Sequence, residues 1–103
     1  VVQVRMVAFG DLGTYSGDGS REACEVKASL LTTDNIKANL NHTDLVLHIG
    51  DISYARGYSS TWDYFLHQIS PIAKRVPWMT AIGNHERCWP ESGSVMGFKD
   101  SRG

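Results

Sequence analysis

Three short apolar runs separated by two amphipathic stretches set the pattern of this chain. The runs are residues 1–9, continuously apolar from MVAF onward, residues 45–49 (LVLHI) and residues 76–82 (VPWMTAI). Short apolar runs that end at a turn residue are typical of strands buried on both faces, as in a parallel sheet. We therefore predict three strands, each followed by Gly-Asp or Gly-Asn.

Between these runs, apolar residues recur at helical spacing. The repeating positions of the first helix are Val26, Leu30, Thr33, Ile36 and Leu40. Those of the second are Trp62, Phe65, Leu66, Ile69 and Ala73. Asn41 is the expected stop of the first helix and Ser60 the expected N-cap of the second. Pro71 should kink or end the second helix early, because proline lacks an amide donor and clashes with the preceding turn.

The order strand, helix, strand, helix, strand predicts an α/β fold. Two consecutive βαβ units give a βαβαβ arrangement of parallel strands with flanking helices and right-handed crossovers. Ligands in such sheets bind at the carboxyl ends of the strands. All three Gly-Asp or Gly-Asn pairs fall at those ends, so we expect the chemistry there.

Length, charge and hydrophobicity argue against nucleic-acid binding and against a membrane span. The 103 residues suffice for one small domain or for part of a larger one. A formal net charge of -1 shows no basic excess, so we expect no nucleic-acid partner. The longest apolar runs are strand-sized, so we expect no membrane span, and residues 1–10 lack the charged leader of a signal peptide. Cys24 and Cys88 are compatible with a disulfide and equally with two free thiols.

The three strand-end pairs are the candidate chemistry. Any one pair alone is a common turn with an Asx hydrogen bond. Neighbouring strands lie about 4.8 Å apart, however, so oxygen atoms of Asp11, Asp51 and Asn84 could converge on one place. Carboxylates that share a place need a cation, and two-metal sites often use a bridging carboxylate.

At this point the motifs resemble a known family. GDLG (residues 10–13), GDISY (50–54) and GNHE (83–86) resemble, in order, the opening motifs of the calcineurin-like metallophosphoesterases. Within that superfamily the chain is most similar to the purple acid phosphatases of plants and protists, because Tyr54 follows Asp51 as in their GD-x-x-Y motif. Protein serine/threonine phosphatases carry aspartate at that position. The stretches DGS (18–20), HIGDISYARGY (48–58) and GNHERCWPESGS (83–94) extend the resemblance over almost the whole chain.

The resemblance implies a metallophosphoesterase sandwich holding iron(III) and a divalent metal, which is zinc, manganese or iron. Asp11 would bind the ferric ion and Asp51 would bridge both metals. Tyr54 would bind the ferric ion as a phenolate and give a purple colour, and Asn84 would bind the divalent metal. His85 would face the phosphate, as the catalytic residue that binds it or handles a proton. Hard oxygen ligands suit iron(III), and mixed oxygen and nitrogen ligands suit the divalent metals.

The implied activity of the full-length protein is that of an acid phosphatase. It would hydrolyse small phosphate monoesters with a hydroxide held on the two metals as the nucleophile. The resemblance also implies a secreted or vacuolar/lysosomal location and is compatible with a homodimer. Asn41 begins an N-x-T sequon, which a secreted glycoprotein would use.

Part of the family's ligand set has no counterpart in these residues. Three further histidines belong to V-x-x-H-like and G-H-x-H segments, and neither occurs here. We therefore expect residues 1–103 to be the N-terminal part of an incomplete catalytic domain, inactive in isolation. The alternatives are a related metallophosphodiesterase or nucleotidase, against which Tyr54 weighs, and an inactive α/β fragment or binding module. His48, inside LVLHI, is interpreted as a hydrogen-bonded core histidine rather than a ligand.

Overall fold

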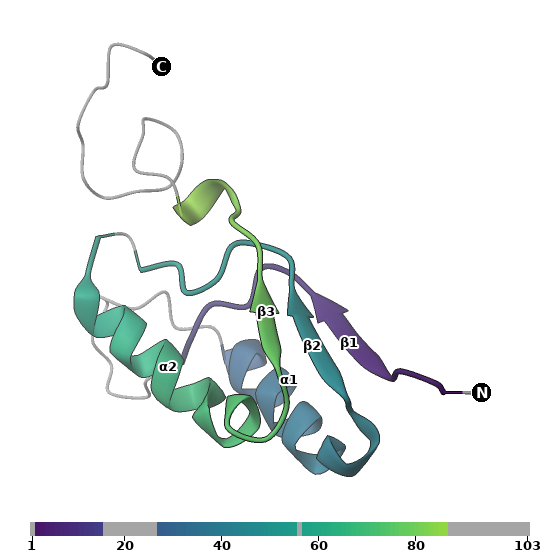
Figure 1. Ribbon diagram of the computed structural model, residues 1–103. Helices are drawn as coiled ribbons and strands as arrows, with labels where there is room; N and C mark the ends of the chain where they lie inside the picture. Colours follow the sequence, from purple (N-terminus) through teal and green to yellow (C-terminus); the bar gives the residue numbers. More distant parts are fainter. Residues whose placement is uncertain (1, 16–26, 56, 87–103) are drawn as a thin grey trace.

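A three-stranded parallel sheet and two helices make up the part of the chain that the computed structural model describes, which is residues 2–15, 27–55 and 57–86 (Figure 1). The strands are β1 (Met6–Phe9), β2 (Leu45–His48) and β3 (Trp78–Thr80), in the order β1-β2-β3. The helices are α1 (Lys27–Ala38) and α2 (Ser59–Ala73), and two short 3-10 turns are η1 (Leu40–His42) and η2 (Asn84–Glu86). The predicted βαβαβ fold is confirmed.

Each strand is shorter than its apolar run. Parallel pairing begins where Met6 lies opposite Leu45, so residues 2–5 have no β2 residue beside them. At the other end, Gly50 has a φ of 104°, a left-handed conformation that cannot continue a strand. β1 ends directly before Gly10, whereas one residue separates the end of β2, and two residues the end of β3, from the glycine of the Gly-Asp or Gly-Asn pair that follows.

One face of the sheet carries both helices. Ile36 from α1 and Ile72 from α2 meet at Val46 on β2 in one apolar cluster. A second cluster joins Phe65 of α2 to residues of the loops that follow β1 and β2. Phe9 packs against both clusters, so the core is continuous between the sheet and the helix layer.

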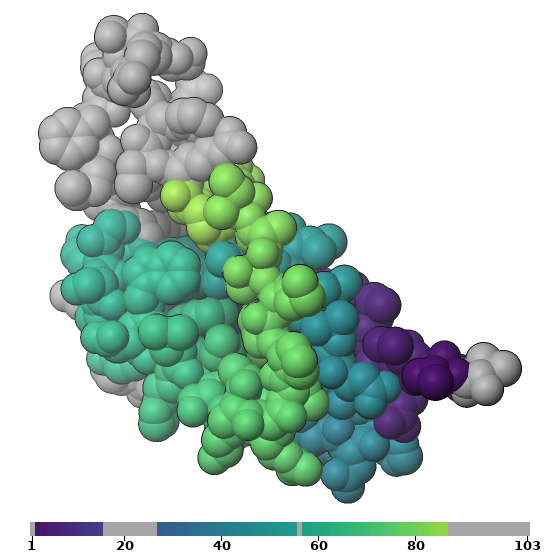
Figure 2. Space-filling view, in the orientation of Figure 1, coloured from purple at the N-terminus to yellow at the C-terminus, as the bar shows by residue number. Residues whose placement is uncertain are grey.

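The opposite face of the sheet is open in the described part of the chain, so these residues alone do not bury the strands on both faces as predicted. Met6, Ile49 and Met79 expose 54%, 65% and 57% of their surface. Two right-handed crossovers that run in the same direction across a sheet place both helices on the same face. In the space-filling view, β3 lies at the surface between α2 and β2 (Figure 2).

The buried stripe of each helix differs slightly from the predicted one. In α1 the buried residues are Ser29, Thr33 and Ile36, and Leu30 is half-buried. In α2 they are Thr61, Phe65, Ile69 and Ile72, whereas Trp62, Leu66 and Ala73 are exposed. Ser29 and Thr61 are buried at positions that the predicted patterns did not include, and the hydroxyl of Ser29 donates to the carbonyl of Gly13 at 3.0 Å.

The predicted ends of α2 need correction. Ser60 is not the N-cap, because the helix begins at Ser59 after Tyr58. Pro71 does not end the helix, which continues to Ala73, and the amide of Lys74 donates to the carbonyl of Ser70 at 3.2 Å. Pro71 lies in the last turn, so the amide that it lacks affects only the end of the helix.

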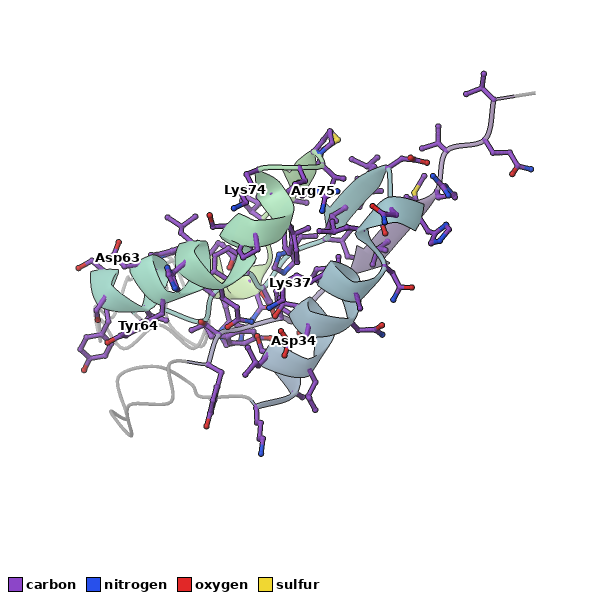
Figure 3. The ribbon with its side chains drawn as sticks, turned by 90° about the horizontal axis from the view of Figure 1, so that it is seen from below. Asp34, Lys37, Asp63, Tyr64, Lys74 and Arg75 are labelled. Atoms are coloured by element: carbon purple, nitrogen blue, oxygen red, sulfur yellow. The ribbon has the colours of Figure 1, made fainter. Side chains whose placement is uncertain are left out.

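Figure 3 labels charged side chains of α1, of α2 and of the residues that follow α2. Lys37 and Asp34 form an ion pair of 2.5 Å on α1. Lys74 and Arg75 follow the end of α2, where cations complement the helix dipole. Among the described residues, neither helix has both the length and the hydrophobicity that crossing a bilayer requires. Cys24 and Cys88 lie outside the described residues.

Candidate metal centre

Three of the four predicted metal ligands lie on loops with left-handed backbone. Asp11 follows β1 with a φ of 55°, and Asp51 and Tyr54 follow β2 with φ values of 48° and 54°. Non-glycine residues seldom adopt this region, and each such residue costs about 1–3 kcal/mol. Strain of this kind concentrates at functional sites, where the surrounding structure holds it in place.

Backbone hydrogen bonds hold the first two loops side by side beyond the end of the sheet. The amide of Asp11 donates to the carbonyl of Gly50 at 3.1 Å, and the amide of Leu12 donates to that of Asp51 at 3.2 Å. The amide of Gly13 continues the series to the carbonyl of Ile52 at 2.9 Å. The loops therefore extend the parallel pairing of β1 and β2 and bring Asp11 beside Asp51.

The phenol of Tyr54 joins the two carboxylates. Its Oη donates to Asp11 Oδ1 at 2.8 Å and lies 3.3 Å from Asp51 Oδ2. Burial, and then the hydrogen bond to Asp11, raise the pKa of the Tyr54 phenol above its ordinary value. A cation among these oxygens would act in the opposite direction, because it favours the ionised phenol.

The loop that follows β3 lies beside the first two loops at the carboxyl ends of the strands. In η2 the amide of His85 donates to Asp51 Oδ1 at 3.0 Å, and the His85 ring packs on the ring of Tyr54 with centroids 4.4 Å apart. Asn84 precedes His85 in the same turn, with an exposed side chain. The structure thus brings Asp11, Asp51 and Tyr54 into contact, places His85 against them, and puts Asn84 at the adjoining position.

Two glycines allow the loops to approach this closely. A Cβ on Gly83 would overlap both the carboxylate and the amide of Asp51. A Cβ on Gly50 would lie 2.9 Å from the Cα of Gly83, and Gly50 also has a positive φ. The first residue of the GDISY motif and that of the GNHE motif therefore have to be glycine, because a larger residue would clash at this site.

Glu86 is a site residue to which the sequence analysis gave no role. Its carboxylate accepts hydrogen bonds from three backbone amides, those of Asp51, Ile52 and Gly83. The motif GNHE contains this acid, but two of its partners lie 34 and 35 positions earlier in the chain. No local spacing in the sequence signals such a contact.

His48 lies in the core as predicted, but without the expected hydrogen bond. It is fully buried, and its ring packs against those of Phe9, Phe65 and Trp78 at centroid distances of 4.9, 5.9 and 5.9 Å. Neither ring nitrogen has a hydrogen-bond partner among the described residues. Burial lowers the pKa of His48 below its ordinary value of 6.5, which favours the neutral ring.

The donor chemistry fits a hard metal ion. Two carboxylates and a phenol share one place, and an amide oxygen is available on the adjoining loop. Oxygen donors of this kind suit iron(III), and a mixed set suits manganese or zinc. Within residues 2–15, 27–55 and 57–86, no three His, Cys, Asp or Glu side chains are grouped to hold a metal. Further ligands of a complete site would therefore come from outside these residues.

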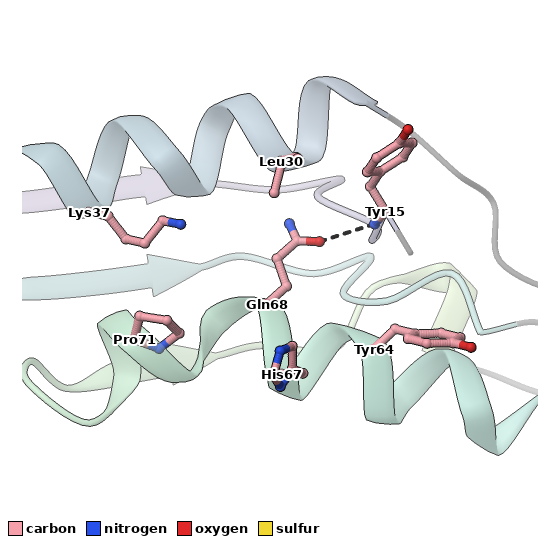
Figure 4. Close-up of a pocket in the computed structure, with 7 residues that line it drawn as sticks. All are labelled: Tyr15, Leu30, Lys37, Tyr64, His67, Gln68 and Pro71. Atoms are coloured by element: carbon pink, nitrogen blue, oxygen red, sulfur yellow. Dashed lines mark hydrogen bonds between the residues drawn. The ribbon is translucent and has the colours of Figure 1, made fainter. Parts of the chain in front are cut away.

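A separate groove lies between α1 and α2, with a volume of about 270 Å³ (Figure 4). At its base Gln68 accepts from the hydroxyl of Thr14 and the amide of Tyr15, and donates to the hydroxyls of Ser29 and Thr33. Gln68, which belongs to α2, thus links the loop that follows Asp11 to α1 by hydrogen bonds. Its hydrogen-bonding groups are occupied by these contacts.

Comparison with known proteins adds independent findings. The model of the family described as calcineurin-like phosphoesterase matches residues 4–102. The chain is 53% identical over 100 residues to "Probable inactive purple acid phosphatase 27" of Arabidopsis thaliana, covering 96% of this chain and 16% of that protein. It is 47% identical over 100 residues to a nucleotide pyrophosphatase/phosphodiesterase of Hordeum vulgare, covering 96% of this chain and 27% of that protein.

A solved structure supports the same relationship. Purple acid phosphatase PPD1 of yellow lupin (Lupinus luteus) seeds matches with a TM-score of 0.77 and 53% sequence identity. The match covers 85% of this chain and 16% of the lupin chain. The chain therefore spans between 16% and 27% of the length of these three proteins.

Proposed function

The chain belongs to the calcineurin-like phosphoesterases and, among them, to the purple acid phosphatases, and we propose that it supplies the oxygen-rich part of a phosphatase metal site. The full-length protein would hydrolyse small phosphate monoesters at acid pH. The observation that carries this proposal is the Tyr54 phenol held between the carboxylates of Asp11 and Asp51. Two carboxylates and a phenol at one sheet edge are oxygen donors that a cation would bring together.

Asp11 and Tyr54 would hold iron(III), Asp51 would bridge to a divalent zinc, manganese or iron ion, and Asn84 would bind that second ion. Bound there, the ions would supply positive charge to the phosphate oxygens and lower the pKa of an attacking water. Asp51 is oriented for bridging, because its Oδ1 is held by the amide of His85 while its Oδ2 faces Tyr54. Its two oxygens therefore point toward different neighbours.

His85 would act on the substrate. Its backbone is fixed through Asp51 and its ring is fixed against Tyr54, so the imidazole is held at the rim of the same site. A histidine in that place can hydrogen-bond a phosphate oxygen and pass a proton to the leaving alcohol. This role is the basis for proposing His85 as the catalytic residue.

The open face of the sheet supports the proposal that residues 1–103 are the N-terminal part of a larger catalytic domain. Met6, Ile49 and Met79 form an apolar surface on that face, and the similar proteins are several times longer. A further layer of the same domain would cover it and bring the remaining metal ligands. In isolation we propose that these residues are inactive.

Phosphodiester or pyrophosphate cleavage is the second candidate activity. The barley relative named nucleotide pyrophosphatase/phosphodiesterase aligns with 96% of this chain at 47% identity, and its name gives that chemistry. Several other similar proteins carry "Probable inactive" in their names, so turnover itself needs a direct test.

The test is an assay of the full-length protein containing this chain, reconstituted with iron(III) and zinc or manganese. We expect hydrolysis of p-nitrophenyl phosphate at acid pH to exceed that of bis(p-nitrophenyl) phosphate, and Asp51→Asn to abolish it. Faster cleavage of the diester would favour the second candidate. Metal binding without turnover of either compound would contradict both hydrolase activities and leave a binding module.

A further inference from the structure

Glu86 accepts hydrogen bonds from three backbone amides on two different loops. Its Oε1 accepts from the amide of Ile52 at 2.6 Å, and its Oε2 accepts from the amides of Asp51 at 3.0 Å and Gly83 at 2.6 Å. Hydrogen bonds to a carboxylate are stronger than those between neutral groups. This one side chain therefore ties the loop after β2 to the loop after β3.

The shape of the loop after β2 explains why an acid is needed there. Gly50 and Asp51 have φ values of 104° and 48°, and the amides that follow, those of Asp51 and Ile52, point to the same carboxylate. Successive amides in such a turn form a concavity that binds an anion. Glu86 is the anion that fills it, so a strained turn is stabilised from a loop distant in sequence.

The two loops hold each other reciprocally. Glu86 accepts from the amide of Asp51, and the Asp51 carboxylate in turn accepts from the amide of His85. Gly83 lies between them with no room for a Cβ beside Asp51. A shift of either loop would therefore move the carboxylate of Asp51 relative to His85 and Asn84.

We infer that Glu86 is a positioning residue of the metal site. By binding the amides of Asp51, Ile52 and Gly83, it fixes the distance between the loop that carries Asp51 and Tyr54 and the loop that carries Asn84 and His85. This inference rests on the proposed function, since it concerns the site that the function requires. Glu86 itself contacts backbone, so it acts through the ligands and not on the substrate.

The sheet offers a matched control at its opposite edge. The carboxylate of Asp44 also accepts a hydrogen bond from a backbone amide distant in sequence, that of Arg5, at 2.8 Å. Arg5 directly precedes β1 and Asp44 directly precedes β2, so this contact lies at the amino ends of the strands, away from the loops that carry the predicted ligands. Asp44→Asn therefore removes a comparable carboxylate without touching the site.

The experiment compares Glu86→Gln, Glu86→Asp and Asp44→Asn with wild type in the metal-stripped full-length protein. Calorimetric titration with Mn²⁺ measures metal affinity, and hydrogen–deuterium exchange measures protection of residues 50–54 and 83–86. Gln must turn an NH₂ group toward at least one of the amides, and Asp keeps the charge but is one methylene too short. We expect both Glu86 variants to lose about 10- to 100-fold in metal affinity, the usual effect of removing a group that supports metal ligands.

Faster exchange in both loops, together with that loss, supports the inference, and Asp44→Asn should leave both measurements unchanged. Wild-type affinity in Glu86→Gln would overturn it, and full affinity in Glu86→Asp alone would show that charge rather than position matters. A wild-type protein that binds no Mn²⁺ would overturn the proposed function instead. The exchange comparison would then still decide whether Glu86 holds the two loops together.

Discussion

Acidic side chains have different surroundings at the two ends of the strands, which are called here the amino edge and the carboxyl edge of the sheet. At the amino edge, Asp44 meets the guanidinium of Arg5 at 3.2 Å as well as its amide, and these hydrogen bonds lower the pKa of Asp44. At the carboxyl edge, the carboxylates of Asp11 and Asp51 lie around a phenol, with no ion pair to a described Lys, Arg or His. An arginine neutralises the acid at one edge, whereas the two acids at the other edge have no described cationic partner, as the proposed cation site requires.

Backbone conformation separates the edges in the same way. All non-glycine residues with positive φ in the described part of the chain, which are Asp11, Asp51 and Tyr54, lie at the carboxyl edge. At the amino edge, where the strands begin, no described non-glycine residue has a positive φ. Strain that coincides with convergent oxygens indicates that side-chain placement, rather than stability, determines the structure of these loops.

The largest expected effect is on metal binding. Asp51→Asn keeps the size of the side chain but removes the charge that would bridge two ions. We expect metal affinity of the full-length protein to fall by about 100-fold or more, beyond the usual effect of a supporting residue. Calorimetric titration measures the affinity. Equal metal affinities for Asp51→Asn and the amino-edge variant Asp44→Asn would contradict the claim that metal binds at the carboxyl edge.

A second prediction concerns packing between the carboxyl-edge loops. Gly83→Ala would place a methyl group against the carboxylate and amide of Asp51, which are held by their own hydrogen bonds. Overpacking of this kind costs about 1–3 kcal/mol of unfolding free energy. In Gly10→Ala the nearest atoms would lie 3.5 Å away, an ordinary contact, so stability should hardly change. Urea unfolding of both variants tests this, and equal costs would show that the loops are not closely packed.

A third prediction concerns pH and the core beneath the site. Burial lowers the pKa of His48 below its value of 6.5 in the unfolded chain. Between the pKa of the folded state and that of the unfolded state, His48 is protonated in the unfolded chain and neutral in the folded chain. The folded state should therefore be most stable above pH 6.5 and lose up to about 1.4 kcal/mol per pH unit as the pH falls. Urea unfolding across this window should show a shallower loss for His48→Leu. The same slope in both proteins would rule out a contribution from His48.

The smallest expected effect is on the stability of the metal-free protein. Tyr54→Phe removes the hydrogen bond to Asp11 and leaves the ring packed on His85. At this half-exposed position the loss should be below about 1 kcal/mol, since a single hydrogen bond adds little where water can replace it. Thermal unfolding measures it. A large destabilisation would mean that Tyr54 is mainly a structural residue of the loop.

Much of the fold was predictable because it follows from local patterns. The apolar runs and the helical spacing gave the element order, and the ends of parallel strands necessarily meet at one edge, which brought Asp11 and Asp51 together. The open sheet face was not predictable from the apolar runs, because continuous runs are typical of strands buried on both faces, whereas the described residues cover only one face. The part that Glu86 plays was also hidden, because its partners are backbone amides that every residue has.

Iron(III) titration of the full-length protein, followed by visible absorption, tests the central claim most directly. If the oxygens of Asp11, Asp51 and Tyr54 form a cation site, iron(III) should bind and give a tyrosinate charge-transfer band that saturates with the metal. The band should disappear in Tyr54→Phe and persist in Asp44→Asn. Iron that binds without a visible band, or a band that survives in Tyr54→Phe, would contradict the account.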